Sequence, residues 1–205
     1  MTRSLLASLL AIVSNLVLGQ WGVRAGAQWE RLSPSALVNG NLSLDHDVND
    51  KLSFSLDLIA GFGLKNRGSA RIGSDSYNYE AATNTFGFTY HSRFFIGDID
   101  RTAFYFGPFL GYRKATISTT PETFSYYYLN APPVLATKQK FSGSLFPVGM
   151  RFGLRDPLDG FFGDVFFAVG TLLGDTERFN RSTLDPKHVI GGVFLQAGYS
   201  VGGGW

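Results

Sequence analysis

Cysteine is absent from the 205-residue chain, and charge is scarce. Without cysteine there can be no disulfide framework and no thiolate metal site. Only 17% of the residues are charged, and the 18 Lys and Arg are scattered among 16 Asp and Glu rather than clustered. This distribution gives no electrostatic footprint for nucleic acid. No cofactor motif is visible, so the sequence predicts no cofactor, no metal site and no nucleic-acid partner.

Long apolar runs are also absent, except at the N-terminus. Arg3 precedes an apolar run over residues 5–18, and the small residue Gly19 follows the run. A charged start, a run of this length and a small residue after it are the layout of a secretory signal peptide. We predict a signal peptide over 1–19 and a mature domain over 20–205. Cleavage after Ala27 and an uncleaved, buried N-terminal helix are the alternatives.

Aromatic residues and glycine are abundant instead, with 19 Phe, 9 Tyr, 3 Trp and 25 Gly. Glycine at this level disfavours a helical fold and suits strands with crowded inner faces. The stretch KLSFSLDLIAGFGL, residues 51–64, alternates apolar residues with mostly polar or small ones. A period of two indicates a β-strand, because successive side chains point to opposite faces.

Such alternation occurs eight times, at residues 21–31, 36–46, 51–64, 85–96, 102–117, 145–154, 161–169 and 189–201. The fifth strand is apolar on both faces. There we predict that Phe104, Phe106, Pro108, Leu110 and Tyr112 face outward, and that Tyr105, Gly107, Phe109, Gly111 and Arg113 face inward.

The connections differ in length. Three connections read as tight turns rich in Asp, Gly or Pro, at residues 46–51, 97–102 and 155–160. Three others read as long polar loops, at residues 66–84, 118–139 and 174–187. Short turns at one end and long loops at the other are typical of a transmembrane barrel, whose short turns face the periplasm.

The alternation also predicts which face meets lipid. One face of the strands is apolar, and the other carries a polar network of Arg24, Glu30, Asp57, His91, Arg93, Arg113, Arg151 and Asp164. A soluble lipocalin-type barrel would reverse this polarity, and the aromatic residues would overfill its interior. We therefore predict an all-β fold, an eight-stranded antiparallel up-and-down transmembrane barrel in a bacterial outer membrane, monomeric and surrounded by lipid.

The strand GPFLGYR and the aromatic terminus Trp205 add a resemblance. Together with the signal peptide and the eight strands, they make the chain resemble the OmpA-type small outer-membrane barrels, especially the OMP β-barrel domains of Bacteroidetes-like bacteria. The resemblance covers residues 20–205 and implies insertion by the barrel-assembly machinery. The terminal GYSVGGGW departs from the usual polar–aromatic alternation, because it spends three positions on glycine.

Candidate chemistry is sparse. The inward charges suit either a salt-bridged plug, since unpaired buried charges are costly, or a small pore. His91 and Ser92 invite comparison with lipid A deacylases, but adjacent residues point to opposite faces, so no catalytic residue is predicted. Asp45, His46 and Asp47 abut a turn and read as a solvated periplasmic end rather than as metal ligands.

The third long loop holds an aromatic group formed by Phe124, Tyr126, Tyr127 and Tyr128, which reads as a binding tip for an extracellular ligand or as part of the outer aromatic girdle. The function that follows is non-enzymatic: a barrel with a filled lumen that supports membrane integrity or surface interaction through its loops. A lipid-modifying enzyme and a small pore are the alternatives.

Overall fold

The computed structural model describes residues 20–31, 36–63, 66–72, 75–97, 101–121, 139–175 and 192–204. The predicted signal peptide and the aromatic group of the third long loop lie outside these residues. The strands are β1 (Gln20–Arg31), β2 (Ala36–Asn49), β3 (Leu52–Gly63), β4 (Asn66–Ile72), β5 (Asp75–Ile96), β6 (Ala103–Pro121), β7 (Gln139–Leu158), β8 (Phe161–Gly174) and β9 (Val193–Gly204). No helix of these residues is long and apolar enough to span a membrane.

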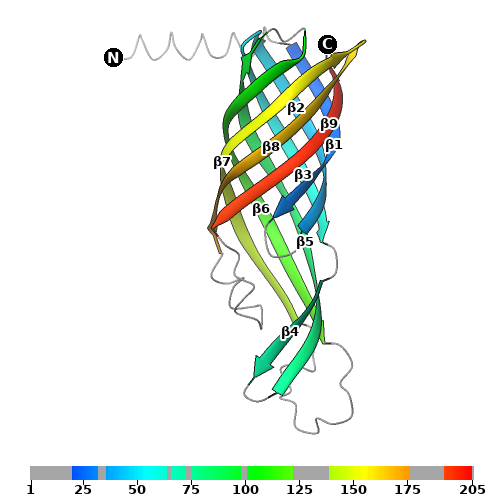
Figure 1. Cartoon of the computed structure of the whole chain (residues 1–205), viewed down its shortest axis with the longest axis vertical. Helices are drawn as coiled ribbons and strands as arrows, with labels where there is room; N and C mark the ends of the chain where they lie inside the picture. The colour runs from blue at the N-terminus through cyan, green and yellow to red at the C-terminus, as the bar shows by residue number, and fades with distance from the viewer. Residues whose placement is uncertain are drawn as a thin grey trace, which may run out of the picture.

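Eight of the strands close into a barrel (Figure 1). The sheet runs β3-β2-β1-β9-β8-β7-β6-β5, every neighbouring pair is antiparallel, and β3 pairs with β5 to complete the ring. A closed ring leaves no unpaired barrel edge. β1 begins and β9 ends at the end of the barrel that carries the β2–β3, β5–β6 and β7–β8 connections, here named the turn end, and the opposite end is named the loop end. The predicted fold class is confirmed.

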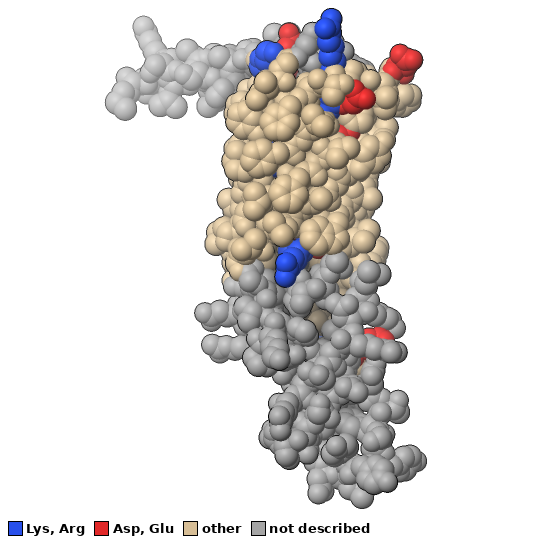
Figure 2. Space-filling view, viewed as in Figure 1, with Lys and Arg blue, Asp and Glu red and all other residues tan. Residues whose placement is uncertain are grey.

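The predicted alternation is present in the structure. In β6, Phe104, Phe106 and Leu110 are exposed on the outer surface, whereas Tyr105 and Phe109 are buried in the lumen. The register predicted for this strand is therefore confirmed. On the face shown in Figure 2, uncharged side chains form a belt around the barrel, with charged side chains gathered at the turn end and a basic side chain at the belt's lower border.

Inward glycines make room for large lumen side chains. A Cβ on Gly198 would lie 2.5 Å from the ring of Phe166, and one on Gly153 would lie 2.4 Å from Tyr105. Both distances are too short for any real Cβ contact. These two aromatic side chains thus occupy space that only glycine leaves on the opposing strand.

The prediction of a loop over residues 66–84 is wrong. Residues Asn66–Ile72 form β4, which pairs antiparallel with the outer half of β5 from Asn66↔Ala81 to Ile72↔Asp75. The outer half of β5 also pairs with β6 as far as Tyr79↔Pro121. This sheet projects beyond the barrel at the loop end (Figure 1). Its sequence lacks an apolar alternation, because beyond the lipid neither face of a sheet must be apolar.

Two strand ends also differ from the prediction. β7 continues through the predicted turn residue Arg155 to Leu158, so that the turn is reduced to residues 159–160, with Gly160 at φ +81°. The terminal glycines belong to β9, where Gly204 pairs with Gly22 of β1. Glycine has no side chain, so a run of glycines shows no alternation of apolar and polar residues. A turn of two residues is likewise too short to be located from the sequence pattern.

Candidate functional site

The barrel lumen holds a cluster of buried charged residues. The structure buries all eight residues of the predicted polar network in the interior. With neighbours that the sequence analysis did not assign to this network, the described part of the lumen holds five arginines and five carboxylates, so their formal charges cancel. These are Arg24, Arg93, Arg113, Arg151 and Arg155, and Glu30, Asp45, Asp47, Asp57 and Asp164.

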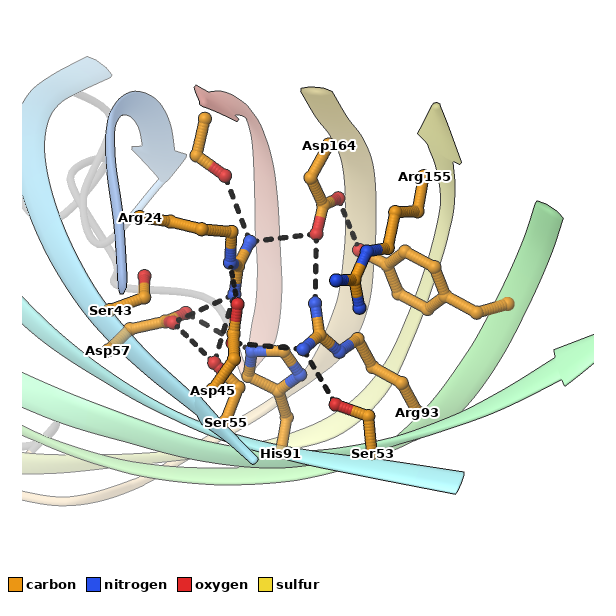
Figure 3. A network of polar contacts seen from close by, with 12 residues as sticks. Arg24, Ser43, Asp45, Ser53, Ser55, Asp57, His91, Arg93, Arg155 and Asp164 are labelled. Carbon is orange, nitrogen blue, oxygen red and sulfur yellow. Dashed lines mark hydrogen bonds and ion pairs between the residues drawn. The ribbon is translucent and has the colours of Figure 1, made fainter. Parts of the chain in front are cut away.

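Two arginines and two aspartates form the centre of this network (Figure 3). Arg24 contacts Asp45 through Nε at 2.5 Å and Asp164 through Nη1 at 2.7 Å. Arg93 bridges the same two carboxylates, at 2.9 Å to Asp45 and 3.2 Å to Asp164. The hydroxyl of Tyr105 donates a further bond to Asp164 at 2.7 Å. Each buried charge therefore meets two opposite charges, which is what burial of an ion requires.

A second cluster surrounds Asp57, nearer the loop end. Arg151 Nη1 lies 2.9 Å from Asp57 Oδ2 and 2.7 Å from His91 Nε2. The guanidinium also stacks on the ring of Phe166 at 4.0 Å and donates to Gln196. Stacking on an aromatic face suits the weakly hydrated guanidinium, so this arginine is held by charge and by ring contact together.

A separate ion pair joins β1 and β6. Arg113 Nε donates to Glu30 at 3.0 Å, and Asn39 Nδ2 donates to the same carboxylate at 2.5 Å. The remaining Arg113 donors reach the carbonyl oxygens of Phe88 and Tyr112 and the hydroxyl of Thr89. Both charged side chains are fully buried.

Apolar and ionic contacts occupy the two ends of the lumen. Towards the loop end, an apolar layer packs together, formed by Leu37, Phe109, Ala115, Ile117, Leu145, Ala168, Leu172 and Phe194. At the turn end, Arg155 pairs with Asp47 at 3.0 Å and stacks on Phe162 at 3.9 Å. Described side chains are thus buried in the lumen at its turn end, at its centre and towards its loop end.

The reading of Asp45, His46 and Asp47 as a solvated end is wrong. Asp45 is buried between two arginines, and His46 is buried on the other face, where its ring lies 4.5 Å from that of Trp21. The carboxylate of Asp47 forms an ion pair with Arg155. The alternation of β2 already placed Asp45 inward, and that signal could have identified it as a network residue. The partner Arg155 was missed because its strand was ended too early.

The network contains the residue types of a catalytic triad but not its arrangement. Ser55 is the cross-strand partner of His91, and His91 Nε2 lies 3.4 Å from Asp57. However, the Ser55 hydroxyl donates to Asp57 at 3.1 Å and accepts from Arg24. The hydroxyl proton is therefore donated to the carboxylate and not to the histidine. A triad needs the base between nucleophile and acid. All three side chains are also buried, and Ser92 lies on the opposite face from His91.

Within the described residues, no group of three or more His, Asp or Glu side chains is placed to hold a metal ion. The predicted loop residues Phe124, Tyr126, Tyr127 and Tyr128 lie outside the part of the chain that the structure describes.

No protein-family model and no curated protein matches the chain. Several solved structures are similar to it, among them the following three. Ail, the attachment invasion locus protein of Yersinia pestis, in complex with the heparin analogue sucrose octasulfate, is 12% identical, with 91% of this chain and 97% of Ail covered and a TM-score of 0.46. The N-terminal β-barrel domain of Pseudomonas aeruginosa OprF is 14% identical, with 91% and 99% covered and a TM-score of 0.35. Neisserial surface protein A is 10% identical, with 90% and 96% covered and a TM-score of 0.45.

The polarity of the barrel itself decides its environment. A closed antiparallel barrel with an apolar exterior and a charged interior is the reverse of a soluble barrel, and it satisfies every backbone group without water. The exposed belt includes Phe62, Phe86, Leu110, Val165 and Leu173. The chain is accordingly an eight-stranded β-barrel of the bacterial outer-membrane type.

Proposed function

We propose that the protein is a non-enzymatic, non-conducting outer-membrane barrel that stabilises the membrane and presents a surface platform for interaction. The observation that carries this proposal is the filled lumen, in which five arginines are matched by five carboxylates and an apolar layer lies towards the loop end. Paired and buried charges hold the barrel closed but leave no hydrated path for ions.

The projecting sheet supports the interaction role. β4, the outer half of β5 and the loop-end parts of β6 and β7 extend beyond the barrel (Figure 1). Rigid scaffolds commonly carry their binding residues on such projecting segments, because the scaffold fixes their position. We include the aromatic loop residues Phe124, Tyr126, Tyr127 and Tyr128 in this platform, which an extracellular ligand would contact. The barrel acts as a monomer in this proposal, and the barrel-assembly machinery inserts it.

Conductance tests the closed lumen. Purified protein reconstituted in planar bilayers should give no stepwise currents, with a known porin in the same bilayers as the control for insertion. Reproducible steps of one size would contradict the proposal and favour a pore.

Lipid analysis tests the alternative of an outer-membrane lipid-modifying enzyme. The buried, acid-centred arrangement of Ser55, His91 and Asp57 argues against such an activity. Lipid A composition should be identical with and without the gene, and a species lost or gained with the gene would favour the enzyme.

A further inference from the structure

The outer surface of β6 and β7 changes character at one level near the loop end. On the turn-end side of that level, the rings of Phe88, Tyr112 and Phe146 form an aromatic cluster on the exterior. The ring centroids of Phe88 and Tyr112 lie 5.9 Å apart, and those of Tyr112 and Phe146 lie 5.6 Å apart. Aromatic residues with a polar tip collect where the apolar layer of a membrane meets its headgroups. The Tyr112 hydroxyl lies 3.3 Å from Ser144 Oγ, so the polar end of the cluster points towards the loop end.

On the loop-end side of the aromatic cluster, the same face becomes polar and basic. Lys114 pairs across the strands with Ser144, Thr116 with Ser142, and Ser118 with Lys140, which places all six residues on one face. We name these six residues the headgroup face. The two lysines and Ser142 are exposed, and the Thr116 and Ser142 hydroxyls lie 2.9 Å apart.

The charge of the headgroup face is positive. It contains two lysines and no acidic residue. Of the described acids nearby, the Asp175 carboxylate accepts the backbone N–H of Ser144, and Glu80 lies opposite Thr120, one outward position further from the membrane. The four-residue rise from Lys114 to Ser118, which pairs with Lys140, spans roughly 13 Å at about 3.3 Å per residue. Hydroxyls lie between the two ammonium groups.

A second strand shows the same order of residues. On β1, Trp29 is exposed on the outer face, and the next outward residue, Arg31, is exposed at the end of the strand. A basic residue thus follows the outermost aromatic by two positions on strands that lie apart in the sheet. This repetition marks the level of the membrane surface and not a local feature of β6.

We propose that the headgroup face binds phosphorylated glycolipids of the outer leaflet, with Lys114 and Lys140 contacting phosphate and the hydroxyls contacting sugar. The face lies on the outer surface of the barrel wall, as the apolar belt on its turn-end side does. The molecules that it contacts first are therefore the surrounding lipids. Basic residues close to an anionic membrane surface gain about 1 kcal/mol each, and a phosphate supplies the charge that the face lacks. This site is distinct from the lumen and from the loops.

The test measures stabilisation by lipid. Wild-type protein is folded in neutral detergent micelles, and its unfolding temperature is followed by heat-modifiable gel migration as diphosphorylated lipid A is added. The same titration uses lipid A from which both phosphates have been removed. We expect the phosphorylated lipid alone to raise the unfolding temperature, and K114Q/K140Q to weaken its apparent affinity roughly 25-fold, from about fivefold per lysine.

Two further variants make the result specific. K114R/K140R should keep the lipid effect, because the charge is retained. K51Q/R101Q removes two exposed basic residues at the turn end and should keep it as well. An unchanged lipid affinity in K114Q/K140Q would overturn the proposal, as would equal stabilisation by dephosphorylated lipid A. Equal stabilisation by inorganic phosphate or by a soluble sulfated saccharide would assign the face to soluble anions instead.

Discussion

The ion pair between Glu30 and Arg113 offers the sharpest test of a filled lumen. The perturbation is a double-mutant cycle with Glu30→Gln, Arg113→Met and the double variant. The glutamine keeps the shape of the glutamate and can still accept from Asn39, while the methionine keeps much of the arginine's length. The charges are removed first one at a time and then together, and Arg113→Met also removes the donors to Phe88, Tyr112 and Thr89.

The structure sets the expected magnitudes. Both side chains are fully buried, so each single variant leaves an uncompensated charge, at a cost of about 3–5 kcal/mol. Glu30→Gln should lie near the lower limit, because Arg113 keeps its bonds to two carbonyl oxygens and to Thr89. In the double variant no charge is stranded, and its cost should not exceed that of the more damaging single change. The coupling free energy is then about 3 kcal/mol or more.

The assay is urea unfolding of the barrel in lipid vesicles, followed by tryptophan fluorescence and by gel migration of unboiled samples. Arg31→Met is the matched control in vesicles of uncharged lipid, since this exposed arginine follows Glu30 directly in the chain and should there change the unfolding free energy by no more than about 0.5 kcal/mol. Single variants that each cost less than about 1 kcal/mol, with additive effects, would mean that water solvates these charges, and the filled lumen would be refuted.

Four other outcomes follow from the structure and the sequence. Leu56→Asp, on the lipid-facing side of β3, should lower stability in vesicles, by less than the ~2–4 kcal/mol that a basic residue would cost at the bilayer midplane, whereas Leu56→Ala should insert normally. Equal behaviour of the two variants would mean that this face does not meet lipid. Gly198→Ala should cost about 1–3 kcal/mol through contact with the Phe166 ring, measured by the same unfolding assay, and an unchanged midpoint would contradict that contact. Intact mass of the membrane form should show Gln20 as the first residue, and recovery of the uncleaved chain would disprove the signal peptide. A Gly/Ser linker over residues 123–133 should leave heat stability intact and abolish a surface phenotype such as adhesion, while a loss of heat stability would assign these aromatics to the girdle.

Local alternation was enough to predict the barrel. Each wall strand has one face in lipid, so its outward residues are apolar at every second position, and this signal is present within one strand without knowledge of its neighbours. The inward position of Arg24, Asp57 and Arg151 follows from the same parity. The signal stops where the lipid stops, which is why β4 and the outer half of β5 were read as a loop.

Only the closed ring decided which charges meet. Arg24 and Asp164 are separated by 140 positions in the chain, yet their atoms lie 2.7 Å apart, because β9 pairs with both β1 and β8 and its register brings the two residues to neighbouring heights. Parity tells that a side chain points inward but not at which depth or towards which partner. The role of Asp45 and the exchange of bonds among Ser55, His91 and Asp57 therefore depend on strand register and barrel closure, which no single strand contains.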